Sequence, residues 1–459
     1  MRFTDPPPSS LSVCTHRKRR PSPLKAYPWD GSAVHHRLLF LIILVFVGFV
    51  AGNAQDGNEA LTLQRCIELA RNAPSSVKRA QEQLAAANFA QRAARANFLP
   101  QVSIANGFTY NSPLLYDNKT FSFIALNGIR EYASAANTSL EVDSSGRLRA
   151  IYDRAQANRK IADAGVTISE RDLERDVAAA YYRVLLTRRL VVSANDNLQA
   201  ARDFEIKVQQ LVSGGEASQA DLTKASLEAS LLEQAANSMK VQAEMAEHAL
   251  ASYWTTNVAV PLVVADDLDQ PLPAPKAPSD SAPYLKRPEF QLFAAQISGF
   301  SADSRQARAR MLPQLNLSFQ YGIDTTRITS RDRGYAGFVH LDIPVFDFLR
   351  ARSEQRQFQS EQRAAQADLS IGTRLFSKEY QDVLSRVTGT YTQIAITQRQ
   401  VDLAKENLRL SQLRFESGEG TALDVATAQS SLAQADIDFY TTRAEYLDAL
   451  SALKVASGQ

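Results

Sequence analysis

The chain contains one long pattern twice, and this internal duplication limits its possible folds more than any other feature. Residues 94–104 read ARANFLPQVSI, and residues 307–317 read ARARMLPQLNL. Further along, a glycine-containing segment at 213–221 is repeated at 417–424. Because the landmarks recur in the same order, the sequence predicts one structural unit of about 200 residues in two copies, which is too long for a solenoid repeat.

Each copy predicts the same succession of elements. A helical pattern ends at a Leu-Pro-Gln sequence, at Pro100 and again at Pro313, since proline interrupts a helix and restricts the residue before it. Alternating apolar and polar residues then predict two strands in each copy. These strands are expected at about 101–111, 132–143, 314–324 and 335–345.

A very long helix follows the strands in each copy, at about 146–212 and 349–416. At about 1.5 Å per residue, each would be on the order of 100 Å long. Apolar residues recur every seven positions, with larger side chains such as Val177 and Val184 in one column and small ones such as Ala180 in the next. This period predicts coiled-coil packing between helices that approach closely.

Sharp turns are predicted where the long helices end. The turn residues are Ser213, Gly214 and Gly215 in the first copy, and Ser417 and Gly418 in the second. Glycine is a common C-terminal stop for a helix. The next helix then opens with Ser218-x-x-Asp221 or with Thr421-x-x-Asp424, and both have the form of a capping box.

The N-terminal region has the pattern of an export signal. A basic segment precedes an apolar run from Leu38 to Ala51, which ends in small residues at Gly52 and Ala54. The run is short for a transmembrane helix of about 20 residues, although a membrane anchor is the alternative interpretation. We therefore expect residues 1–54, a cationic region and signal peptide, to be removed on export.

The remaining chain divides into three parts: a first repeat at 55–256, a proline-rich linker at 257–287 and a second repeat at 288–459. One short strand, at 258–264, is expected in the linker. The exported part carries 44 basic and 47 acidic residues, which favours no nucleic-acid partner.

The predicted strands could belong to either of two kinds of sheet. Strands of about ten residues match a tilted transmembrane barrel, but a soluble, half-buried sheet alternates in the same way. Four strands cannot close a barrel, because single-chain barrels begin at about eight strands. A barrel therefore requires strands from several chains.

These features together resemble the TolC-like outer-membrane efflux protein family (outer membrane factors). The resemblance rests on the duplicated Leu-Pro-Gln junctions, the glycine-containing turns, and Asp221 and Asp424 at the next helix starts; residues 415–432 are the most family-like segment. It implies a mainly α fold with a transmembrane β part. As a homotrimer, the chains would form a twelve-stranded outer-membrane β-barrel continued by an α-helical coiled-coil barrel through the periplasm.

The resemblance also implies partners and a location. Outer-membrane lipid would surround the barrel, and a periplasmic adaptor protein would bind the helical tips and couple them to an inner-membrane transporter. Substrates would then leave the cell without entering the periplasm. No cofactor and no metal are implied.

The resemblance places a gate at the helical tips. Asp424 falls on an acidic constriction, where three carboxylates would favour cations; alternatively Asp424, like Asp221, only caps its helix. The chain departs from the family pattern at two gate positions that tie neighbouring coils together: Phe415 lacks the hydroxyl of a Tyr, and Gly420 has no guanidinium to pair with Asp221. It also departs at Thr427, the second acidic position. We expect a single ring and a closed tip that is held differently or less firmly.

Other function classes fit the sequence less well. An enzyme is disfavoured because the exported part has two histidines, no metal-binding cysteine pairs and no phosphate-binding glycine loop. The main alternative is a periplasmic coiled-coil scaffold without channel activity. A type I protein exporter would use the same barrel, and the sequence does not distinguish it from a drug or metal efflux channel.

Overall fold

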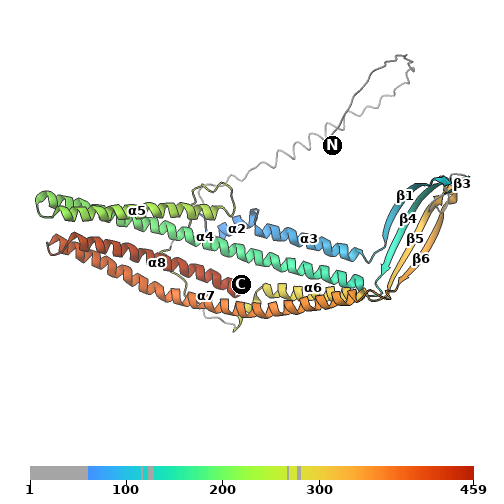
Figure 1. Cartoon of the computed structure of the whole chain (residues 1–459). Helices are drawn as coiled ribbons and strands as arrows, with labels where there is room; N and C mark the ends of the chain where they lie inside the picture. The colour runs from blue at the N-terminus through green and yellow to red at the C-terminus, as the bar shows by residue number, and fades with distance from the viewer. Residues whose placement is uncertain (1–59, 115–116, 122–128, 266–267, 276–280, 459) are drawn as a thin grey trace, which may run out of the picture. The chain divides into compact units, whose positions relative to one another are not determined.

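Long helices and a small β-sheet make up the part of the chain that the structure describes. The computed structural model describes residues 60–458 except 115–116, 122–128, 266–267 and 276–280. The sheet lies at one end of the helices, and the two helical turns lie at the other end (Figure 1). The predicted export signal at 1–54 lies outside the described residues.

The two halves share one order of elements. The first half contains α2 (Leu63–Asn72), α3 (Ser76–Ala96), β1 (Gln101–Tyr110), the short strands β2 (Pro113–Leu114) and β3 (Asp117–Phe121), β4 (Arg130–Val142), α4 (Arg147–Gly214) and α5 (Gln219–Ala251). The second half contains η1 (Pro283–Lys286), α6 (Glu289–Ala309), β5 (Gln314–Thr325), η2 (Ser330–Asp332), β6 (Gly334–Asp342), α7 (Arg350–Glu416) and α8 (Ala422–Ala456).

The main sheet is antiparallel with the strand order β1-β4-β5-β6, so β4 and β5 join the two halves. The outer edges of β1 and β6 have no strand partner among the described residues. The last strand was predicted to reach Val345 but ends at Asp342, because Pro344 has no amide hydrogen for the ladder. The strand expected at 258–264 is reduced to one bridge between Leu61 and Val264.

The helices pack as two antiparallel hairpins, α4 with α5 and α7 with α8, and α4 also contacts α8. Nearer the sheet, α3 packs on α4, while α6 packs on both α4 and α7. Within the described ranges, no helix is both long enough and apolar enough to cross a bilayer.

The seven-residue columns form the core of these hairpins. Val177 and Val184 of α4 are completely buried, as are Val425 and Tyr446 of α8. The small column of α8 is buried as well, for example at Ala449. Burial of one large and one small column confirms the predicted coiled-coil packing, since small side chains let helix axes approach closely.

A buried ion cluster joins α4, α6 and α7 in the middle of the molecule. The carboxylate of Glu289 accepts hydrogen bonds from Arg171 at 2.8 and 2.9 Å and from Arg287 at 2.9 Å. Arg287 also donates to Glu379 at 2.7 Å and lies over the ring of Phe376. Burial alone would raise the pKa of Glu289, but the two arginines outweigh it and lower the pKa to about 2.

Candidate functional site

The sheet has one apolar and one polar face. Strand register aligns Ile104, Ala136, Tyr321 and Tyr335 in one row across the sheet. The next row contains Ser103, Asn137, Gln320 and Ala336. Because successive side chains of a strand point to opposite faces, these rows lie on opposite sides of the sheet.

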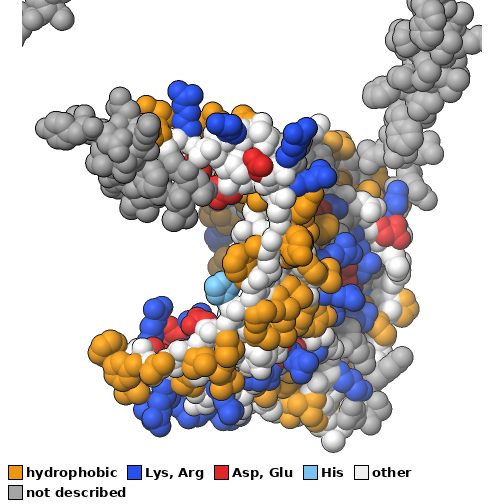
Figure 2. Space-filling model, turned by 90° about the vertical axis from the view of Figure 1, so that its right-hand side faces the viewer, with side chains coloured by type: hydrophobic (Ala, Val, Ile, Leu, Met, Phe, Trp, Pro, Cys, Tyr) orange, Lys and Arg blue, Asp and Glu red, His pale blue; other side chains and the backbone are white. Residues whose placement is uncertain are grey.

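The apolar face of the sheet is uncovered in the single chain. Val102 and Ile104 of β1 are 71% and 74% exposed, and Tyr335 and Val339 of β6 are 79% and 72% exposed. Figure 2, in which the strand end faces the viewer, shows a broad band of hydrophobic side chains beside a hollow. A patch of this extent marks a surface that another chain or a membrane covers.

The Leu-Pro-Gln motif has a structural role that the sequence analysis missed. The side-chain amide of Gln101 donates to the carbonyl oxygens of Ala96 and Leu99, both at 3.0 Å. Gln314 repeats this arrangement on the last turn of α6. Each glutamine therefore adds a side-chain bond at the end of the helix, where Pro100 or Pro313 supplies no N–H. The Ala96 and Ala309 carbonyls also accept from the N–H groups of Leu99 and Leu312. The signal was in the sequence, since glutamine follows both prolines.

Both predicted capping boxes are present at the opposite end. The Asp424 carboxylate accepts hydrogen bonds from the backbone N–H and the hydroxyl of Thr421, both at 2.9 Å. These bonds lower the pKa of Asp424, which is exposed, with a smaller effect from nearby cationic side chains. Asp221 accepts from the Ser218 hydroxyl at 2.6 Å. The side chain of Asp424 is thus a fixed, ionised carboxylate at the tip.

The predicted glycines and serines form the turns at the ends of α4 and α7. Gly215 and Gly418 adopt left-handed φ angles of 79° and 76°, which residues with a side chain rarely adopt. The hydroxyls of Ser213 and Ser417 donate to carbonyls of the preceding helical turn. Gly214 is the last residue of α4, so the helix ends slightly later than predicted.

Phe415 joins the two hairpins within one chain. Its ring packs edge-on against Phe204 of α4, with 5.1 Å between ring centroids. Phe204 is buried in a cluster with Val208 and Val425. Phe204 is not predictable from the sequence pattern, because its contact with Phe415 joins residues far apart in the chain. An apolar contact therefore ties α7 to α4 at the tip.

Gly420 and Thr427 complete the predicted tip residues. A Cβ atom on Gly420 would lie 3.0 Å from the backbone nitrogen of Phe415 and 3.1 Å from the carbonyl carbon of Arg414, so the turn has little space for a side chain there. Thr427 is exposed, and its hydroxyl donates to the Leu423 carbonyl one turn earlier. Neither residue has a charged side chain, so neither can form an ion pair at the tip.

The sequence as a whole matches a known family. The pattern described as "Outer membrane efflux protein" matches residues 66–256 and 284–459, which together exceed half of the chain. The chain belongs to the outer membrane efflux protein family.

Individual relatives have low sequence identity to this chain, but the matched segments cover most of its length. The pyoverdine export outer membrane protein OpmQ of Pseudomonas aeruginosa is 24% identical over 313 residues, which are 67% of this chain and 65% of that protein. The outer membrane protein OprJ of the same species is 22% identical over 441 residues, 90% of this chain and 85% of that protein. The solved Campylobacter jejuni CmeC outer membrane channel is 14% identical with a TM-score of 0.79, covering 87% and 89% of the two chains.

These findings confirm three predictions made from the sequence. The family is the one that the motifs resembled, the fold is a mainly helical tunnel with a β part, and the location is the outer membrane. The family and fold are those of channel proteins rather than enzymes. The roles of the individual tip residues remain predictions.

Proposed function

We propose that this protein is the trimeric outer-membrane channel of a tripartite efflux system. The observation that carries the proposal is a four-stranded sheet with an exposed apolar face and two edges that no described strand pairs with. In a lipid bilayer, every backbone polar group needs a partner, so strands can cross it only in a closed barrel. Three copies supply twelve strands, an even number within the range of outer-membrane barrels.

The helices support the same arrangement. Leu227 and Met245 of α5 are exposed on one outer helix, and Leu375 and Leu403 of α7 are exposed on the other. Figure 1 shows β1 on the side of α5 and β6 on the side of α7. One kind of contact repeated around an axis would therefore cover strands and helices together. Such a head-to-tail contact closes into a ring.

The polar sheet face and the tip carboxylate would then line the conduit. In the trimer, Asp424 of each copy contributes to one ring of three negative charges at the helical end, which favours cations. Thr427 adds no second ring, and the Phe415–Phe204 contact ties each chain to itself rather than to its neighbour. We therefore propose a tip that opens more readily than one closed by ion pairs between chains.

The partners follow from the same assignment. We propose that a periplasmic adaptor binds the hairpin turns at 213–218 and 417–421 and connects them to an inner-membrane transporter. The cargo is taken to be small molecules, as in the pyoverdine export named for OpmQ. A type I exporter would differ in cargo rather than in the structure of this chain.

The first test is the native mass of the protein extracted from outer membranes in mild detergent. We expect a trimer that forms ion-conducting pores in planar bilayers. A water-soluble monomer or dimer without conductance would refute the channel and favour the coiled-coil scaffold.

The tip is tested on the same pores with Asp424→Asn. We expect block by multivalent cations to weaken about tenfold or more, because three charges disappear from one ring. Asp221→Asn is the matched control, since it alters the equivalent cap of the other hairpin. If multivalent cations block both variants and the unaltered channel equally well, the proposed ring of Asp424 carboxylates is contradicted. Gly420→Arg is a poorer test, because any side chain there crowds the backbone of the turn.

A further inference from the structure

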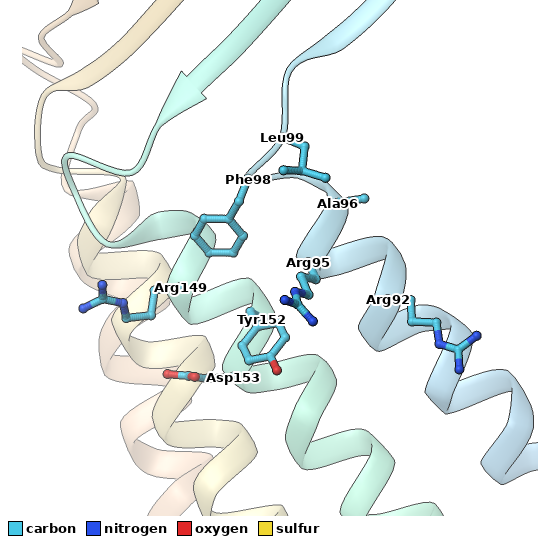
Figure 3. A pocket seen from close by; sticks show the side chains of 8 residues that line it. All are labelled: Arg92, Arg95, Ala96, Phe98, Leu99, Arg149, Tyr152 and Asp153. Carbon is cyan, nitrogen blue, oxygen red and sulfur yellow. The ribbon is translucent and has the colours of Figure 1, made fainter.

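A pocket lies between α3 and α4, where β1 leaves the helices (Figure 3). Its volume is about 700 Å³, within the usual range for small-ligand sites. One part of its lining is cationic, with Arg92, Arg95 and Arg149. The other part is apolar, with Phe98 and Leu99 in the turn between α3 and β1.

The three arginines have no counter-charge in the described structure. None of them forms an ion pair with a described carboxylate, in contrast to Arg147 with Glu141 and Arg154 with Asp303 nearby. The carboxylate of the pocket, Asp153, is engaged by Arg305 at 2.7 Å. The pocket therefore has an uncompensated positive charge and suits an anionic ligand.

The second repeat differs at the corresponding place. The groove between α6 and α7 is bridged by ion pairs from Arg310 and Arg350 to Glu354. By the alignment of the repeats, Arg308 corresponds to Arg95, and Arg352 corresponds to Arg149. Arg308 and Arg352 therefore carry the same charge at equivalent positions of the second repeat, but they do not line this pocket. They can serve as control positions.

The distance between the pocket and the apolar residues of β1 indicates where the pocket would lie relative to the membrane. Val102, the first exposed apolar residue of β1, lies three positions after Leu99, which corresponds to about 10 Å of extended chain. At a barrel strand tilt of about 35–45°, this is about 7–8 Å along the membrane normal. Headgroup layers extend about 5–8 Å beyond the hydrocarbon on each side. If the apolar band of β1 lies in the hydrocarbon, as the proposed function requires, the pocket lies at the level of the periplasmic headgroups.

We propose that this pocket binds the phosphate headgroup of an anionic phospholipid from the periplasmic leaflet. Arg95 lies between α3 and α4, and Arg92 and Arg149, which point to opposite sides in Figure 3, rotate towards the phosphate on binding. The acyl chains follow Phe98 and Leu99 towards the apolar face of β1. An inorganic anion would leave these two exposed side chains uncovered. A zwitterionic headgroup would bring an ammonium group among three arginines while Asp153 is already paired.

The test compares lipid binding by two double variants of the full-length trimer. Phosphatidylglycerol, phosphatidylethanolamine or glycerol 3-phosphate is titrated into delipidated protein in maltoside detergent, and bound lipid is counted by native mass spectrometry. We expect up to one phosphatidylglycerol per chain and weaker binding of the other two. Arg95→Gln with Arg149→Gln should weaken phosphatidylglycerol binding about tenfold or more, whereas Arg308→Gln with Arg352→Gln should not.

Each other result overturns the site. Equal weakening in both variants would mean general charge attraction, and equal binding of glycerol 3-phosphate would mean a free-anion site. Absence of bound phosphatidylglycerol would mean that a neighbouring copy covers the pocket or that it stays empty. A conducting trimer that binds no lipid refutes this site alone, whereas a protein that forms no trimer refutes the channel as well. If a double variant yields no trimer, Arg95→Gln and Arg308→Gln give the same comparison.

Discussion

The Glu289 cluster leads to a quantitative prediction about stability. Replacing Glu289 with Gln removes the negative charge between Arg171 and Arg287 and leaves the volume almost unchanged. The side chains of Arg287 and Glu289 are only 6% and 16% exposed, so water cannot replace the lost carboxylate fully. The variant should therefore lose stability through uncompensated positive charge.

The size of the effect follows from the pKa of Glu289. A fall from 4.5 to about 2 corresponds to an upper limit of roughly 3.4 kcal/mol. We reduce this to about 2 kcal/mol, since Glu379 still pairs with Arg287 and solvent screens part of the interaction. For a chain of this length, that loss lowers the midpoint of thermal unfolding by about 2–4 °C.

The pH dependence gives the sharper test. Because folding lowers the pKa of Glu289, its stabilising contribution is complete above about pH 4.5 and disappears as the pH falls towards 2. The midpoints of the unaltered protein and Glu289→Gln should therefore differ at pH 7, approach each other below about pH 4.5 and coincide near pH 2. Circular dichroism at 222 nm in detergent, at fixed protein concentration, measures both midpoints.

The matched control is Glu82→Gln, which removes an exposed ion pair with Lys78. This change should alter the midpoint by less than about 1 °C, since exposed pairs contribute little. The reasoning is refuted if Glu289→Gln melts with the unaltered protein at pH 7. A deficit that persists undiminished at pH 3 would show that the cause is not the carboxylate charge.

Three further predictions concern the sheet, a junction and a tip. Gly322→Ala should greatly lower the yield of assembled trimer on semi-native gels, because its Cβ would lie 2.0 Å from the Ser134 carbonyl oxygen; Gly337→Ala meets nothing within 4 Å and should assemble normally. Leu349→Gly should leave the unfolding midpoint equal or up to about 3 °C higher, because relief of a left-handed φ of 64° offsets the added chain entropy; a lower midpoint would contradict strain. Thr421→Ala should speed hydrogen exchange in the first turn of α8 about fivefold, corresponding to about 1 kcal/mol for a lost cap, and unchanged exchange would refute it.

Much of this fold follows from local sequence signals. The Leu-Pro-Gln stops, the glycine turns and the two capping boxes each act within a few residues, so the sequence predicts them directly. Strand alternation also located the four long strands, because the sheet keeps its apolar residues on one face. The error at the end of β6 arose from counting Val345 in the alternation although Pro344 cannot continue the ladder.

The remaining features depend on contacts between distant residues. Phe204 and Phe415 meet only because two long hairpins bring their ends together. The cluster around Glu289 joins three helices, and the pocket at Arg95 needs the start of α4 beside the end of α3. Periodicity places such residues on a helix face but does not identify the opposite helix, so one sequence cannot predict these sites.

The two unpaired sheet edges have a genetic consequence. In the proposed trimer, a chain with a damaged β6 edge would keep an intact β1 edge, so it would still join other copies but prevent the ring from closing. If half of the chains in a cell carry such a defect, only about one ring in eight contains intact chains alone. Mutations at either edge should therefore be dominant over the unaltered gene, whereas mutations that abolish folding of the whole chain should be recessive.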